Sequence, residues 1–143
     1  MRTSRAMFVG SFVVVATTFL AARYAMSASP ASHDRVFEIR TYTTEPGKLP
    51  DLLKRFRDYT TKLFEKHGMT NIGYWVPTDE PRSKNTLIYV LAHKSRDAAK
   101  KSWADFRNDP DWQKAQKASE ANGKIVTKVE SIFADPTDFS AIK

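Results

Sequence analysis

Cysteine is absent from the 143-residue sequence, and this absence excludes several kinds of chemistry. A chain without cysteine forms no disulfide, cysteine-ligated zinc site or iron–sulfur cluster, and it has no thiol nucleophile or acylated lipoprotein cysteine. Three motifs are also missing: the dinucleotide-binding Gly-x-Gly-x-x-Gly, the P-loop, and the Gly-x-Ser-x-Gly of serine hydrolases. Nucleotide cofactors and serine hydrolase activity are therefore disfavoured, and the fold must rely on packing alone.

Acidic residues are missing from the amino-terminal part of the chain, where the first one is Asp34. Two arginines precede an uncharged run over 6–22, and small residues follow at Ser27 and Ala28. This pattern predicts a secretory signal peptide over 1–28, and hence a periplasmic or secreted protein. An uncleaved membrane anchor is the alternative, because the run is only slightly short of a membrane span. A mitochondrial transit peptide fits less well, since the run is not amphipathic.

The charge of the chain gives little support for nucleic-acid binding. Loss of 1–28 removes three arginines and no acid, so the formal net charge falls from +7 to +4. The remaining cations alternate with acids rather than forming a basic block. We predict one domain over 35–134, preceded by a disordered lead-in over 29–34 and followed by a tail over 135–143.

The order of the predicted elements indicates the fold class. Period-two alternation predicts strands over 35–43, 69–76, 85–93 and 124–133. Helical spacing of apolar residues predicts three helices. The first covers 49–67 and ends at Gly68, and the second covers 95–108 and is capped by Ser95. The third is capped by Asp109 and ends at Asn122-Gly123. The order βαββαβ predicts an α+β, ferredoxin-like fold with one antiparallel sheet and the helices on one face.

Two tryptophans, Trp103 and Trp112, lie on either side of an Asn-Asp-Pro break between the last two predicted helices. Pro110 suits the first position of a helix, where its missing N–H is not needed. Helical spacing places both indoles on inward faces, so we expect this elbow to pack against the sheet.

Strand alternation divides the sheet residues into two sets. We expect the less polar set to lie under the helices: Phe37, Ile39, Ile88, Val90 and Ala92. The opposite face would then present Glu38, Arg40, Tyr42, Leu87, Tyr89, Leu91, His93, Val126, Lys128 and Glu130. That second set is too apolar to face water and too charged for a dry core. It predicts a homodimer in which two sheets face each other around a polar-aromatic cavity.

Several separated motifs resemble the NIPSNAP domain of the dimeric α/β-barrel superfamily: 36–42, 67–69, 73–75 and 103–112. The resemblance implies a ferredoxin-like dimeric barrel. The superfamily includes haem-degrading and quinone-forming monooxygenases, muconolactone isomerase-like enzymes and stress-responsive binding proteins. For NIPSNAP members themselves no general reaction is implied, and fold alone is a weak guide to chemistry.

Five side chains on the predicted cavity face are the candidate ligand-binding residues: Glu38, Arg40, Tyr42, Tyr89 and His93. Arg40 would hold an anionic or carbonyl group, the two tyrosines would pack the ligand and donate hydrogen bonds, and His93 would act as an acid, a base or a second donor. The alternative is that Glu38 and Arg40 form only a structural ion pair.

No metal is assigned, because His67 and His93 show no local ligand spacing. Haem ligation by His93 is suggested only by the superfamily, and no cofactor is assigned. Two function classes stay open. One is a barrel that binds a small organic molecule. If this barrel is an enzyme, it transforms the molecule by a monooxygenase- or isomerase-like reaction. The other is a non-catalytic interaction module, which a large apolar patch on the helical side would favour.

Overall fold

A computed structural model describes residues 35–143 of the chain. The predicted leader over 1–28 and lead-in over 29–34 lie outside the described residues. Within the described part, no helix has the length and apolar character needed to cross a membrane.

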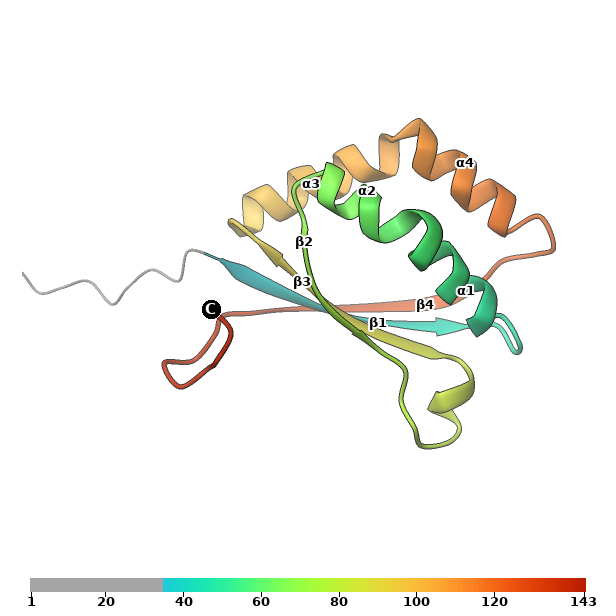
Figure 1. The fold of residues 1–143 in the computed structure, drawn as a ribbon, viewed down its shortest axis with the longest axis horizontal. Helices are drawn as coiled ribbons and strands as arrows, with labels where there is room; N and C mark the ends of the chain where they lie inside the picture. The colour runs from blue at the N-terminus through green and yellow to red at the C-terminus, as the bar shows by residue number, and fades with distance from the viewer. Residues whose placement is uncertain (1–34) are drawn as a thin grey trace, which may run out of the picture. The chain divides into compact units, whose positions relative to one another are not determined.

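Four strands form one antiparallel sheet in the order β2-β3-β1-β4, and the helices cover one of its faces (Figure 1). The elements in chain order are β1 (Val36–Thr44), α1 (Leu49–Arg55), a π-helical turn η1 (Phe56–Thr60), α2 (Thr61–Lys66), β2 (Thr70–Trp75), a 3₁₀ turn η2 (Arg82–Lys84), β3 (Thr86–His93), α3 (Arg96–Asn108), α4 (Pro110–Ser119) and β4 (Val126–Ala134). The predicted ferredoxin-like α+β fold is confirmed.

The predicted first helix is continuous but contains a π-helical turn that its apolar spacing did not indicate. The hydroxyls of Thr60 and Thr61 donate to the carbonyl oxygens of Arg55 and Phe56, at 3.2 and 3.3 Å. These side-chain hydrogen bonds reach carbonyls five residues back, where the widened turn leaves room. The helix ends at Gly68, whose φ of 77° favours glycine, as predicted.

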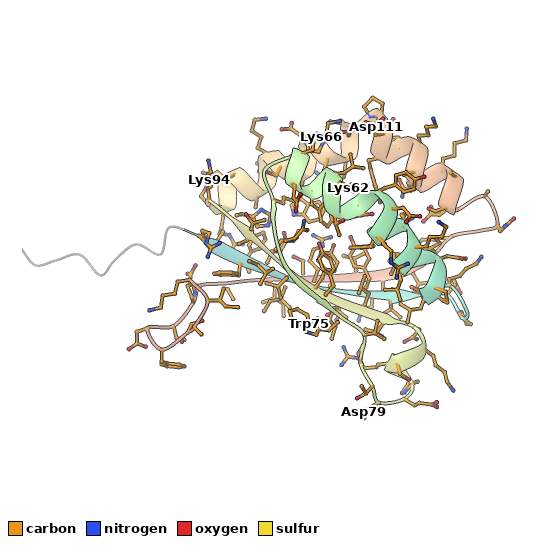
Figure 2. All side chains as sticks on the ribbon, in the orientation of Figure 1. Lys62, Lys66, Trp75, Asp79, Lys94 and Asp111 are labelled. Carbon is orange, nitrogen blue, oxygen red and sulfur yellow. The ribbon has the colours of Figure 1, made fainter. Side chains whose placement is uncertain are left out.

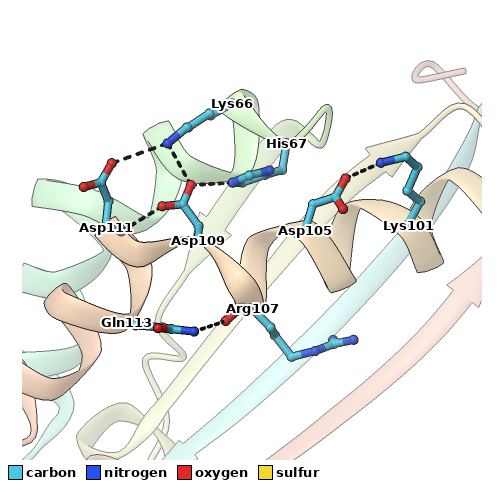
Figure 3. Close-up of polar contacts among 8 residues, drawn as sticks. All are labelled: Lys66, His67, Lys101, Asp105, Arg107, Asp109, Asp111 and Gln113. Atoms are coloured by element: carbon cyan, nitrogen blue, oxygen red, sulfur yellow. Dashed lines mark hydrogen bonds and ion pairs between the residues drawn. The ribbon is translucent and has the colours of Figure 1, made fainter.

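The elbow between α3 and α4 follows the predicted capping. Ser95 accepts a hydrogen bond from the backbone N–H of Ala98, and the Asp109 carboxylate accepts one from the backbone N–H of Asp111 at 2.8 Å. The same carboxylate lies 2.8 Å from Lys66 Nζ and 2.6 Å from His67 Nε2 (Figure 3). Hydrogen bonds from Lys66 and His67 hold the pKa of Asp109 well below its usual range. Asp109 therefore joins the end of α2 to the start of α4.

The two faces of the sheet are exchanged relative to the prediction. Leu87, Tyr89 and Leu91 are buried beneath the helices, in a core with the aromatic rings of the helical layer. The Phe64 ring packs within 6.1 Å, centroid to centroid, of four others: Phe56, Tyr89, Trp103 and Phe106. The larger side chains thus belong to the covered face, where they bury the most apolar area. The expectation that Leu87, Tyr89, Leu91 and Val126 form a dimer surface is therefore wrong.

A bulge separates the two ends of β4. The pairing of β1 with β4 shifts between Thr43 and Thr44, so Val126 packs against the core while Lys128 pairs opposite Thr43, on the other face. Beyond the bulge, Ser131 lies opposite Arg40 and Phe133 opposite Glu38. Lys128 and Glu130 therefore do not share a face with Glu38, which corrects the predicted set.

The face that carries no helices, here called the open face, is largely apolar. Phe37, Ile39, Val90 and Ile72 line a pocket of about 240 Å³ on it together with the C-terminal tail. Trp75 projects from this side with 53% of its surface exposed (Figure 2), and Ile132 is 64% exposed. Lys128 and Glu130 make one end of this face polar. Single exposed apolar residues are ordinary, but several on one side of a sheet indicate an interaction surface.

Candidate functional site

The centre of the polar structure beneath the helices is the carboxylate of Glu38, which is 1% exposed. Its Oε1 accepts hydrogen bonds from Arg40 and from the Ser131 hydroxyl, both at 2.6 Å. Its Oε2 accepts one from Trp103 Nε1 at 2.6 Å and lies 3.0 Å from His93 Nε2. Four polar partners from β1, β3, β4 and α3 thus converge on one buried acid.

These partners keep Glu38 ionised. Burial alone would raise the pKa of its carboxyl group, but hydrogen bonds from His93, Ser131 and Trp103 and the charge of Arg40 lower that pKa to about 2. An ionised carboxylate only accepts hydrogen bonds, so the Nε2 atom of His93 carries the proton that it donates.

The Glu38 site predicts acid sensitivity. Because its pKa is lower in the folded protein than the 4.5 of an unperturbed glutamate, the stability it contributes is complete above pH 4.5 and is lost as the pH falls towards 2. The lost stability should be on the order of 3 kcal/mol. Urea unfolding across this pH range checks it, with Glu38→Gln as the comparison. Equal slopes of stability against pH in the two proteins would contradict the assignment.

Arg40 links this network to the protein surface. In the sheet it lies between Tyr89 of β3 and Ser131 of β4. Its guanidinium carbon stands 4.1 Å from the centroid of Trp103, and 15% of its side chain is exposed. One of its donors, Nε, is buried and has no hydrogen-bond partner among residues 35–143.

A cleft of about 440 Å³ opens between α3 and the β1–β4 side of the sheet. It is lined by Glu38, Arg40, Arg96, Asp97, Lys100, Trp103, Arg107 and Phe133. Four of these side chains are cationic and two are acidic, and the Glu38 carboxylate is already engaged by Arg40. The cleft is therefore suited to a ligand that carries negative charge.

The five candidate residues lie on one side of the sheet, but only two of them line this cleft. Tyr89 is completely buried, its OH has no partner, and burial raises the pKa of that hydroxyl. Tyr42 packs edge-on against Tyr89, at 5.2 Å between ring centroids. His93 is buried behind Glu38, and its Nδ1 has no partner. Glu38 and Arg40 thus face the cleft, while Tyr42, Tyr89 and His93 pack behind them beneath the helices.

Sequence reasoning missed several cleft residues. Trp103 could line a pocket or belong to the core by its helical spacing, and the core was preferred; its indole N–H also donates a hydrogen bond to Glu38. The cations of α3 recur at spacings of four and seven residues, at Arg96, Lys100 and Arg107, which places them on one side of a helix. That spacing could have been recognised in the sequence. The role of Ser131 could not, because the bulge in β4 determines which face of the sheet Ser131 lies on.

No group of three histidine, aspartate or glutamate side chains among residues 35–143 is arranged to hold a metal ion. His67 instead hydrogen-bonds Asp109 in the helical elbow, and His93 hydrogen-bonds Glu38. Both histidines thus have structural partners.

Solved structures with the same fold include proteins from three bacteria. A NIPSNAP family protein of unknown function from Agrobacterium tumefaciens has 24% identity and a TM-score of 0.66, covering 78% of this chain and 96% of its own. A NIPSNAP-like domain protein from Burkholderia xenovorans has 17% identity and a TM-score of 0.65, covering 76% of this chain and 90% of its own. The monooxygenase from the gene ActVA-Orf6 of Streptomyces coelicolor, solved with the ligand Nanaomycin D, has 12% identity and a TM-score of 0.54, covering 78% of this chain and 95% of its own.

No curated protein matches the sequence. The NIPSNAP family profile, in contrast, matches residues 37–141, which include every strand and helix of the sheet domain except the first residue of β1. The chain therefore belongs to the NIPSNAP family.

Proposed function

We propose that this NIPSNAP protein is an exported homodimer that binds a small organic molecule with a carboxylate or carbonyl group in the α3 cleft, with Arg40 as the anchor. The observation that carries the proposal is Arg40 on the wall of a cationic cleft, with a buried Nε–H that meets no acceptor in the described part of the chain. A buried donor left unpaired costs about 1–3 kcal/mol, which an acceptor on a ligand would offset.

Two neighbours prepare Arg40 for this role. Glu38 balances its charge through one terminal nitrogen, which leaves other N–H groups of the guanidinium free to bind. Trp103 lies against the guanidinium and limits its orientation. A planar, oriented guanidinium can bind a carboxylate through two parallel hydrogen bonds, which a lysine cannot do.

The proposal is limited to binding. The Streptomyces monooxygenase shares 12% identity with this chain, and a likeness at that level shows a common fold and not a common reaction. The alternative of an interaction module is less well supported. Among the large hydrophobic side chains exposed in residues 35–143, only Tyr59 of the helical layer and Val129, opposite Tyr42 in β4, lie on the helical side, and they belong to separate elements.

The homodimer in this proposal uses the open face. Ile39, Trp75 and Ile132 are exposed there, and a second copy of the same face would cover them by two-fold symmetry. The barrel interior would then be mostly apolar, and each ligand would lie under the helices of one subunit.

Export rests on the leader pattern of the sequence. N-terminal sequencing of the envelope protein should find a start after Ser27 or Ala28, and an intact Met1 in the cytosol would contradict it.

Native mass spectrometry of the protein purified from its own cell envelope tests the binding proposal. We expect a retained organic ligand whose affinity falls by about tenfold to a hundredfold in Arg40→Lys, because the lysine keeps the charge beside Glu38 but loses the planar donors. Arg82→Met, in the exposed η2 turn, is the matched control. Ligand retention unchanged in a folded Arg40→Lys protein would overturn the proposal.

A further inference from the structure

The cleft-facing cations of α3 differ from the other charged groups of that helix. Arg96, Lys100 and Arg107 line the cleft, and no ion pair involves them among the described residues. On the same helix, Lys101 pairs with Asp105 at 2.5 Å (Figure 3). The helix therefore neutralises its outer side through a pair four residues apart and leaves its cleft side cationic.

Two arginines of the cleft lie against aromatic rings. The guanidinium of Arg96 stands 4.3 Å from the centroid of Phe133 in β4, and that of Arg40 stands 4.1 Å from the centroid of Trp103 in α3. Stacking on a ring restricts a long flexible side chain before any ligand arrives. Arg40 already has a carboxylate partner in Glu38, whereas no carboxylate between residues 35 and 143 pairs with Arg96.

The balance of charge in the cleft indicates how many acidic groups it can accept. Asp97 contributes one negative charge to the lining of the cleft, and Glu38 pairs with Arg40. Two positive charges of the cleft remain without a counterion among residues 35–143. Like charges held together repel one another, and the repulsion is relieved when an anion binds between them.

We propose that the ligand of the α3 cleft is an organic dianion, with one acidic group at Arg40 and a second at the cations of α3. The class comprises dicarboxylates and phosphorylated carboxylates whose organic part lies beside Trp103 and Phe133. This inference rests on the proposed function, since it names the kind of molecule that Arg40 anchors. A volume of about 440 Å³ is adequate for such small molecules.

Calorimetric titration with defined probes tests the inference on the full mature protein. The probes are isophthalate and adipate as dianions, benzoate as a monoanion, and inorganic phosphate as an anion without an organic part. We expect at least one dianion to bind about tenfold or more tightly than benzoate, because three partly exposed cations each add a modest attraction. The preference should weaken with added salt.

The variant Arg96→Gln/Lys100→Gln/Arg107→Gln should remove this preference, because it should weaken dianion binding by much more than benzoate binding. Lys101→Gln, which changes the outer side of the same helix, should leave the preference intact. Four results would overturn the inference. In the wild type these are equal binding of monoanions and dianions, phosphate binding as tight as dianion binding, and no dianion binding at millimolar concentration. The fourth is a dianion preference that survives the triple substitution.

The titrations of the wild type and the variants also distinguish a failure of this inference from a failure of the proposed function. If benzoate binds in an Arg40-dependent way and a second carboxylate adds nothing, the proposed function stands and the dianion inference fails. If dianions bind through α3 and Arg40→Lys has no effect, the cationic site is real but the proposed anchor is wrong.

Discussion

Glu38→Gln should lower the free energy of unfolding by about 3–5 kcal/mol, because it removes one partner of a buried ion pair. The glutamine would leave Arg40 as a largely buried cation without a counterion. It would also direct an amide N–H₂ towards a site where Trp103 and Ser131 already donate, so at least one donor would lose its acceptor. Urea unfolding of the two proteins at neutral pH measures the difference.

The double variant Glu38→Gln/Arg40→Met tells a structural pair from a functional one. Removing both charges takes away the unpaired cation, so the double variant should recover most of the stability lost in the single one. Ligand retention should still be lost, because the anchor is gone. Glu45→Gln, at an exposed position of the turn after β1, is the control and should change stability by less than about 0.5 kcal/mol. A double variant as unstable as Glu38→Gln would show that the pair itself is not the source of the effect.

The exchanged faces show what strand alternation can predict. A period of two sorts Glu38, Arg40 and Tyr42 from Phe37 and Ile39 whatever lies above the sheet, and this division was correct. It does not say which set the helices cover. The charged set was assigned to the face away from the helices because the other set was less polar and this one was too charged for a dry core, where a buried carboxylate is costly. That cost is offset by Arg40 on the same strand and by donors from three elements that are distant in sequence, and no local pattern reveals the convergence of those three.

Local signals, in contrast, were reliable wherever a single residue determines backbone geometry. Ser95, Asp109 and Gly68 were predicted to cap or end helices and do so. The same reasoning failed for the π-helical turn and for the bulge between Thr43 and Thr44, which insert a residue without changing composition. The bulge has the larger consequence, because it brings Ser131 to Glu38 and sends Lys128 and Glu130 to the open face.

Replacing two open-face residues should convert the proposed dimer into a monomer. Ile39 is 36% exposed and Ile132 is 64% exposed in the single subunit. Covering such side chains contributes about 1.5–3 kcal/mol each when burial is complete, and a lysine in their place would bring an unpaired charge into an apolar interface. Ile39→Lys/Ile132→Lys should therefore raise the dimer dissociation constant by a hundredfold or more, about 3 kcal/mol.

Sedimentation equilibrium of the mature domain over a range of protein concentrations measures this change. Both positions are on the surface of the subunit, so the variant should keep its helical circular dichroism and unfold cooperatively as a monomer. Tyr59→Lys is the matched control, because Tyr59 is 52% exposed but lies on the helical side. It should leave the dimer intact. A wild-type protein that sediments as a folded monomer at micromolar concentration would contradict the open-face dimer, and dissociation by Tyr59→Lys alone would place the interface on the helices instead.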